Sequence, residues 1–124
     1  MNQSLKVLVV DDSRVSRMMS SAMIKSIRAG AEIVEADNGD AALVAQQATP
    51  CDIGILDMNM PGMTGLELAA HLHQLNPDMP LALLTANVQD SVRNRADEEG
   101  VHFFRKPIRE EVIGQILDTL APQR

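Results

Sequence analysis

Short apolar stretches alternate with helical patterns five times along this 124-residue chain, and this alternation constrains the fold more than any other feature. Strands are expected at residues 5–10, 31–36, 52–56, 80–85 and 101–104. Helices are expected at residues 14–28, 40–48, 66–75, 89–99 and 109–120. Parallel neighbours in a sheet need a crossover between them, so this order indicates a parallel sheet with helices on both faces. The common doubly wound, flavodoxin-like α/β arrangement of such a sheet has the strand order 2-1-3-4-5.

The helix expected at residues 14–28 carries its apolar side chains three and four residues apart. These are Val15, Met18, Met19, Ala22, Met23 and Ile27. Such spacing is typical of a helix with one buried face, so these side chains are expected to pack in the core.

Composition limits what the chain can do. Its length fits one domain, which is expected to extend over residues 1–124. A formal net charge of −6 gives no broad electrostatic reason to bind nucleic acid or an anionic membrane, so neither direct nucleic-acid binding nor membrane insertion is expected. No apolar run approaches the roughly 20 residues that span a bilayer. The single cysteine, Cys51, fits a reducing compartment, and a cytoplasmic location is expected.

Acidic and polar side chains stand at the ends of the predicted strands. They are Asp11, Asp12, Asp57, Thr85 and Lys106. Ligand sites in doubly wound sheets lie outside the carboxyl ends of the strands, so these side chains are expected to converge in one shallow pocket. An aspartate at a strand end, taken alone, is more often a turn or cap residue than a catalytic one.

Three carboxylates on one rim repel one another unless a cation compensates their charge. Oxygen ligands with open coordination positions suit magnesium, so a divalent metal is implied. A carboxylate facing such a metal can attack phosphorus and form an acyl phosphate. Lys106 could then pair with the anionic oxygens, and the Thr85 hydroxyl could donate a hydrogen bond to one of them.

Four fragments, each at the end of a predicted strand, together carry a family resemblance. They are Val9-Val10-Asp11-Asp12-Ser13, Asp57-Met58-Asn59-Met60-Pro61-Gly62-Met63-Thr64-Gly65, Leu84-Thr85-Ala86 and Lys106-Pro107. With these fragments the chain resembles the receiver domains of two-component response regulators, and among them the chemotaxis-type single-domain regulators. The resemblance covers nearly the whole chain.

The resemblance implies a role for each matching residue. Asp57 would be the phosphoacceptor, and Asp11 and Asp12 would position Mg2+ (or Mn2+) together with Asp57 and the backbone carbonyl of Asn59. Lys106 would be the cation that pairs with the phosphoryl group. Thr85 would be the switch hydroxyl, and Phe103 the aromatic residue that turns into the space that Thr85 vacates. A cis peptide bond is also implied between Lys106 and Pro107.

The implied function is phosphotransfer from the phosphohistidine of a sensor histidine kinase to Asp57, which then alters the face made by the fourth helix, fifth strand and fifth helix. Such a receiver catalyses its own phosphotransfer and autodephosphorylation but does not turn over a metabolite. Its other partner would be a downstream protein target that the sequence does not identify, with a phosphatase as a further candidate. We expect a monomer or a weak dimer. Asn59 and Asn87 flank the phosphoryl site and could tune the hydrolytic water in either direction.

Other readings of the sequence compete with this one. The alternative is a receiver-like protein-interaction module that works without phosphorylation, because motifs can persist without activity. A flavodoxin-like cofactor binder would need an anion cradle after the first strand and aromatic rings to enclose a flavin, but this chain is only 2% aromatic. An aspartate-nucleophile phosphohydrolase would want an acid-base carboxylate where Asn59 stands.

Overall fold

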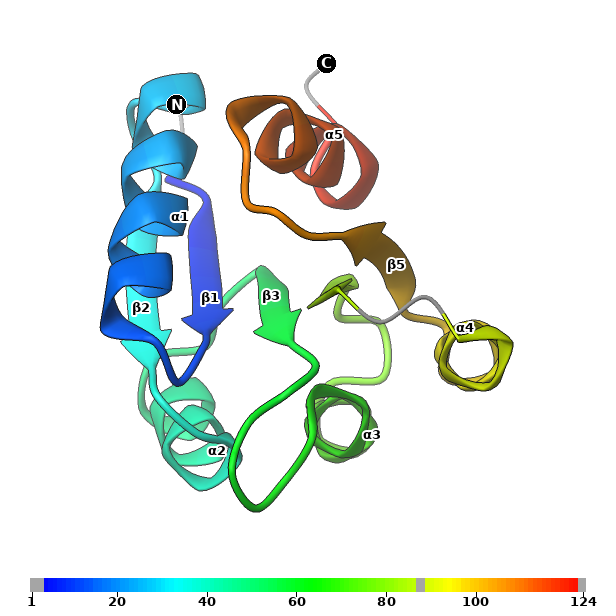
Figure 1. The fold of residues 1–124 in the computed structure, drawn as a ribbon. Helices are drawn as coiled ribbons and strands as arrows, with labels where there is room; N and C mark the ends of the chain where they lie inside the picture. The colour runs from blue at the N-terminus through cyan, green and yellow to red at the C-terminus, as the bar shows by residue number, and fades with distance from the viewer. Residues whose placement is uncertain (1–3, 87–88, 123–124) are drawn as a thin grey trace.

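A parallel sheet lies at the centre of the protein, with helices on both of its faces (Figure 1). The structure, a computed structural model, describes residues 4–86 and 89–122. Within these residues the sheet has five strands in the order β2-β1-β3-β4-β5, which confirms the predicted flavodoxin-like fold. Asn87, for which a role beside the site was predicted, lies outside the described residues.

Strands and helices alternate along the chain as the sequence predicts. The strands are β1 (Lys6–Val10), β2 (Glu32–Ala36), β3 (Ile53–Asp57), β4 (Leu81–Thr85) and β5 (His102–Arg105). The helices are α1 (Arg14–Ile27), α2 (Gly39–Ala48), α3 (Gly65–Leu75), α4 (Asp90–Glu99) and α5 (Glu110–Leu120). Most boundaries differ from the predicted ones by one residue, which is ordinary fraying at the ends of elements. One shift matters, because Asp57 is the last residue of β3 rather than the first residue after it.

The sheet separates two hydrophobic clusters among the described residues. One cluster packs between the sheet and the helices α2, α3 and α4, and includes Leu56 and Leu83. The other packs between the sheet and the helices α1 and α5, and includes Ile55 and Leu84. Successive side chains of a strand point to opposite faces, so β3 and β4 contribute to both clusters and are buried along their whole length.

The prediction for the buried face of α1 is wrong for most of its residues, although Met23 packs partly buried against the cluster under α1 and α5. Val15 is 66% exposed, Met18 57% and Met19 43%, while the helix buries Ser20, Ser21 and Ile24 instead. Ser20 and Ser21 face the interior beside Ile24, whose side chain enters the core. Val15, Met18 and Met19 therefore form an apolar stripe on the surface of α1, on the side of the helix opposite to its packing face.

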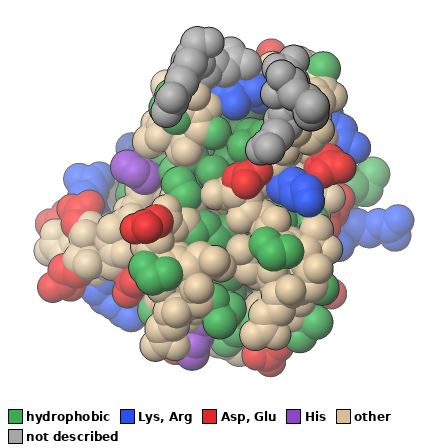
Figure 2. Space-filling model, turned by 180° about the vertical axis from the view of Figure 1, so that it is seen from behind, with side chains coloured by type: hydrophobic (Ala, Val, Ile, Leu, Met, Phe, Trp, Pro, Cys, Tyr) green, Lys and Arg blue, Asp and Glu red, His purple; other side chains and the backbone are tan. Residues whose placement is uncertain are grey.

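The surface seen from the opposite side mixes charges of both signs with small hydrophobic patches (Figure 2). In the described parts of the chain, no helix is both long enough and apolar enough to cross a bilayer.

Candidate functional site

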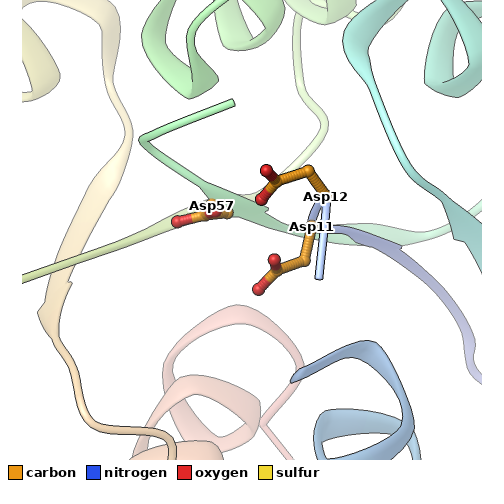
Figure 3. Close-up of side chains that lie close together, drawn as sticks. All are labelled: Asp11, Asp12 and Asp57. Atoms are coloured by element: carbon orange, nitrogen blue, oxygen red, sulfur yellow. The ribbon is translucent and has the colours of Figure 1, made fainter. Parts of the chain in front are cut away.

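Three carboxylates meet at the carboxyl ends of β1 and β3 (Figure 3). Val10 and Leu56 are partners in the parallel register of these neighbouring strands. Asp11 follows Val10 and Asp57 follows Leu56, so the two aspartates lie side by side. One oxygen of each of Asp11, Asp12 and Asp57 lies within 4.8 Å of the others. Asp11 and Asp57 are buried, whereas Asp12 is exposed. The cluster is therefore open to solvent on one side only.

Asp11 is held in place by the turn that follows β1. Its amide donates a hydrogen bond to the carbonyl of Ala36 on β2 over 3.2 Å. Its Oδ1 atom accepts a hydrogen bond of 2.9 Å from the amide of Ser13, the residue that caps α1. The direction of this carboxylate is thus set by backbone contacts on both sides of the turn.

Lys106 brings a cation to the acidic cluster. Its Nζ atom lies 2.9 Å from Oδ1 of Asp57 and 4.0 Å from Oδ2 of Asp11. Apart from this ion pair, no group in the described part of the chain donates a hydrogen bond to the buried Oδ1 of Asp57. This oxygen keeps capacity for a further positively charged or donor group, such as a metal ion.

The acidic cluster carries more negative charge than Lys106 offsets. Burial raises the pKa of Asp11 above its usual value, and the carboxylates of Asp57 and Asp12 raise it further. The hydrogen bond from Ser13 and the charge of Lys106 act in the opposite direction without cancelling that rise. A site made of carboxylate oxygens with uncompensated negative charge fits a hard divalent cation such as Mg2+.

The loop after Asp57 is fastened to the end of the strand by backbone contacts. Met58 donates a hydrogen bond to the carbonyl of Leu84, and Gly65 donates one to the carbonyl of Met58. A Cβ atom at position 65 would overlap the carbonyl oxygen of Asp57, so the loop can return this closely only with glycine there. Thr64 then caps α3, because its hydroxyl accepts from the amide of Glu67 while the Glu67 side chain accepts from the amide of Thr64.

Asn59 lies exposed in that loop, two residues beyond Asp57. Its position beside the cluster is compatible with a backbone ligand, and its carbonyl as a metal ligand stays a prediction. The Lys106–Pro107 peptide bond is cis, which is the isomer that the resemblance implied.

Thr85 and Phe103 belong to the other face of the sheet. Phe103 pairs with Leu83 in the register of β4 and β5, and both lie with the cluster under α4. Thr85 follows Leu83 by two residues and so projects to that same face. Asp57 follows Ile55 in the same way and projects to the face of α1 and α5. The structure brings together four of the five strand-end residues expected in one pocket, namely the three aspartates and Lys106. The place of Thr85, which is fully buried, in that pocket stays a prediction.

Sequence reasoning missed two residues that shape the site. Arg17 donates a hydrogen bond of 2.7 Å to the carbonyl of Asp11, and Gly65 allows the close return of the loop. For Arg17, the available signal was its position one helical turn after the cap residue Ser13. The role of Gly65 could be seen only in the structure, because many turn glycines do not lie so close to another backbone atom.

Known proteins are similar to this chain in sequence and in fold. The sequence model of the response regulator receiver domain family matches residues 7–118. The two-component response regulator ORR41 of Oryza sativa subsp. japonica is 30% identical over 120 residues, which are 91% of this chain and 91% of that protein. The sensor histidine kinase RcsC of Salmonella typhimurium is 31% identical over 97% of this chain, which spans only 13% of the kinase. The sensor histidine kinase GacS of Pseudomonas protegens is likewise matched over only 13% of its length.

Solved structures agree with these relatives. The chemotaxis protein CheY4 of Vibrio cholerae superimposes with a TM-score of 0.87 at 30% identity, over 95% of this chain and 99% of that one. The chain belongs to the response regulator receiver domain family. The family places the chain in two-component signalling.

Proposed function

We propose that Asp57 accepts a phosphoryl group from the phosphohistidine of a sensor histidine kinase and that the chain signals through the resulting aspartyl phosphate. The observation that carries this proposal is the convergence of Asp57 with two further carboxylates and the ammonium group of Lys106. A carboxylate nucleophile, acidic oxygens that could hold a divalent cation and an ammonium group 2.9 Å from Asp57 are the groups that phosphoryl transfer to an aspartate uses.

The side chains divide the work of this transfer. An oxygen of Asp57 attacks phosphorus, and the bond from phosphorus to the donor nitrogen breaks as the new P–O bond forms. Lys106 lies close enough to pair with the oxygens of the transferred group, where negative charge is concentrated. Little proton transfer is needed at Asp57, because its carboxylate is already the nucleophilic form.

Asp11, Asp12, Asp57 and the carbonyl of Asn59 would hold Mg2+ (or Mn2+). When bound, the ion would neutralise charge on the phosphoryl oxygens and fix their orientation. The same residues, with Asn59 beside the site, would also govern hydrolysis of the aspartyl phosphate by the chain itself.

The signal would leave through the face formed by α4, β5 and α5. Phe103 pairs with Leu83 on the sheet face that α4 covers, and Thr85 lies two residues beyond Leu83 on β4, which supports a coupled movement of Thr85 and Phe103. The α4 helix is polar and buries only Val92 and Ala96, so it can shift at low cost in core packing. A protein target that senses this face would be the output partner.

The partners remain proposals. The apolar stripe of α1 lies beside the site, since Met19 and Lys106 line the same hollow. A kinase domain that brings phosphohistidine to Asp57 could bury this stripe. Action as a single receiver domain, a phosphatase partner, a monomeric or weakly dimeric state and a cytoplasmic location stay predictions of the sequence.

Amide NMR spectra distinguish this function from a phosphorylation-independent interaction module. With Mg2+ and a small acyl-phosphate donor, we expect shifts at Ser13 and Met58 beside the site, and at Phe103 on the far face. The variant Asp57→Asn should show no such donor-dependent shifts. Donor-dependent shifts of equal size in Asp57→Asn would contradict the proposal and favour the interaction module.

A further inference from the structure

Arg17 joins three parts of the fold immediately behind the acidic cluster. Its Nη1 atom donates a hydrogen bond of 2.7 Å to the carbonyl of Asp11, and its Nε atom lies 3.1 Å from Oε1 of Glu35. The first contact reaches the turn after β1, and the second reaches the edge strand β2. Its side chain is only 15% exposed, so this surface arginine is largely enclosed by its contacts.

The other end of this network returns to α1. The hydroxyl of Ser21, one helical turn beyond Arg17, donates a hydrogen bond of 3.4 Å to Oε2 of Glu35. Glu35 is therefore held between the two α1 side chains and directs the guanidinium toward the turn. Because the guanidinium is planar and its donors have fixed directions, two contacts fix its orientation.

The carbonyl that Arg17 binds belongs to a proposed metal ligand. Beside the ion contact of Lys106 with its Oδ2 atom, Asp11 has three hydrogen-bond contacts that fix its position: its amide to Ala36, its Oδ1 to the amide of Ser13, and its carbonyl to Arg17. Arg17 supplies the one contact of the three that comes from a side chain. Replacing it changes the support of Asp11 without altering any carboxylate of the cluster.

We propose that Arg17 is a positioning residue of the metal site, which holds the Asp11 turn so that the Asp11 and Asp12 carboxylates meet Asp57. This inference rests on the proposed function, because it assigns Mg2+ to these carboxylates. Residues that orient metal ligands from behind typically affect metal affinity by about 10–100-fold when mutated.

The sign of the effect separates positioning from charge. A guanidinium near an acidic site repels a divalent cation, so its loss through charge alone would strengthen Mg2+ binding. Loss of positioning would weaken Mg2+ binding. The two explanations therefore predict opposite changes for the same substitution.

The experiment is a Mg2+ titration of the full chain at constant ionic strength, followed through the amide signal of Ser13 by NMR. Arg17→Gln removes the charge and the guanidinium fork. Arg14→Gln is the matched control, because it removes the same charge from an exposed position in the first turn of the same helix. We expect Arg17→Gln to bind Mg2+ about 10-fold or more weakly than the wild type. Arg14→Gln should bind it equally or more tightly.

Two results overturn the inference. Binding by Arg17→Gln as tight as by Arg14→Gln means that Arg17 contributes only charge, while the proposed function stands. Absence of Mg2+ binding by the wild type contradicts both this inference and the proposed function. If Arg17→Gln proves unfolded by circular dichroism, Arg17→Lys is measured in its place. Lysine keeps the charge but replaces the planar guanidinium fork with a compact ammonium group, and weaker Mg2+ binding than in the wild type is again expected. Binding by Arg17→Lys as tight as by the wild type would overturn the inference.

Discussion

The Nζ atom of Lys106 lies 2.9 Å from Oδ1 of Asp57, although the strands that carry them, β5 and β3, are separated in the sheet by β4. The pair forms because Lys106 follows the end of β5, where its long side chain can reach across the end of β4. A buried carboxylate near two others is stabilised in this way by a cation from a distant part of the sequence.

Loss of the Lys106 charge should destabilise the protein. We expect Lys106→Met to lower the free energy of unfolding by about 1–3 kcal/mol, because Oδ1 of Asp57 is left buried without its partner. Lys25→Met, at an exposed position of α1, should change it by less than about 0.5 kcal/mol. Urea unfolding measures both, and equal stabilities of the two variants would argue against a structural ion pair. Mg2+ should stabilise Lys106→Met more than the wild type, because it restores the missing positive charge.

The acidic cluster should make stability depend on pH in a defined direction. The pKa of Asp11 is raised in the folded protein above 3.8, so the folded state binds more protons than the unfolded state between those two values. Stability from this group is therefore present at low pH and lost as pH rises through the folded pKa. Asp11→Asn keeps the oxygen that accepts from Ser13 but carries no charge.

We expect Asp11→Asn to melt at a higher temperature than the wild type at neutral pH in the presence of a chelator. The difference should shrink as the pH is lowered through the raised pKa of the wild-type Asp11 carboxyl, which then becomes protonated. Mg2+ should raise the melting temperature of the wild type and not that of the variant. A lower melting temperature for Asp11→Asn in chelator would show that its charge is not a cost to the fold.

The two faces of α1 should respond differently to the same truncation. Ile24→Ala should cost about 2–5 kcal/mol, because Ile24 is fully buried in the cluster under α1 and α5. Met18→Ala should change stability by less than about 0.5 kcal/mol, because Met18 is 57% exposed. Chemical unfolding of both variants measures the loss of unfolding free energy that each truncation causes. A larger loss in Met18→Ala would favour the burial pattern read from the sequence.

Arg93 should bias the position of Phe103. Its Cζ atom lies over the Phe103 ring at 5.5 Å from the centroid, a cation–π contact between α4 and β5. Such contacts at exposed sites contribute about 0.5–1 kcal/mol, which corresponds to a change of about two- to fivefold in ring populations. Since Phe103 has no hydroxyl group, this contact replaces the polar bias that a tyrosine would have.

Fluorine NMR with fluorophenylalanine tests this contact cleanly, because the chain has only two phenylalanines. Phe104 lies on the opposite face of the sheet and serves as the internal reference. Arg93→Gln should shift the Phe103 signal and raise its second population, whereas Arg95→Gln, on the same helix, should leave it unchanged. Identical Phe103 spectra in the two variants would show that Arg93 exerts no bias.

The sequence predicts the order of the strands because parallel sheets demand buried apolar runs and crossover helices, and both are visible in the residue pattern. It also predicts the meeting of Asp11, Asp12 and Asp57, since the ends of parallel strands share one edge. That Thr85 shares the same pocket stays a prediction.

The packing face of α1 could not be predicted from hydrophobicity. Methionines at regular spacing resemble a core face, yet the helix buries Ser20, Ser21 and Ile24. The network of Arg17 and Glu35 was hidden for a related reason. It joins α1 to β2, and no local sequence pattern shows which side chains of two distant elements face each other.

The central claim is that Asp57 is the phosphoacceptor, and intact-mass measurement tests it most directly. Wild type and Asp57→Asn are incubated with a small acyl-phosphate donor, each with Mg2+ and with a chelator. We predict one phosphoryl adduct on the wild type with Mg2+, and none in chelator or on Asp57→Asn. No adduct on the wild type with Mg2+, or the same adduct on Asp57→Asn, would contradict the claim.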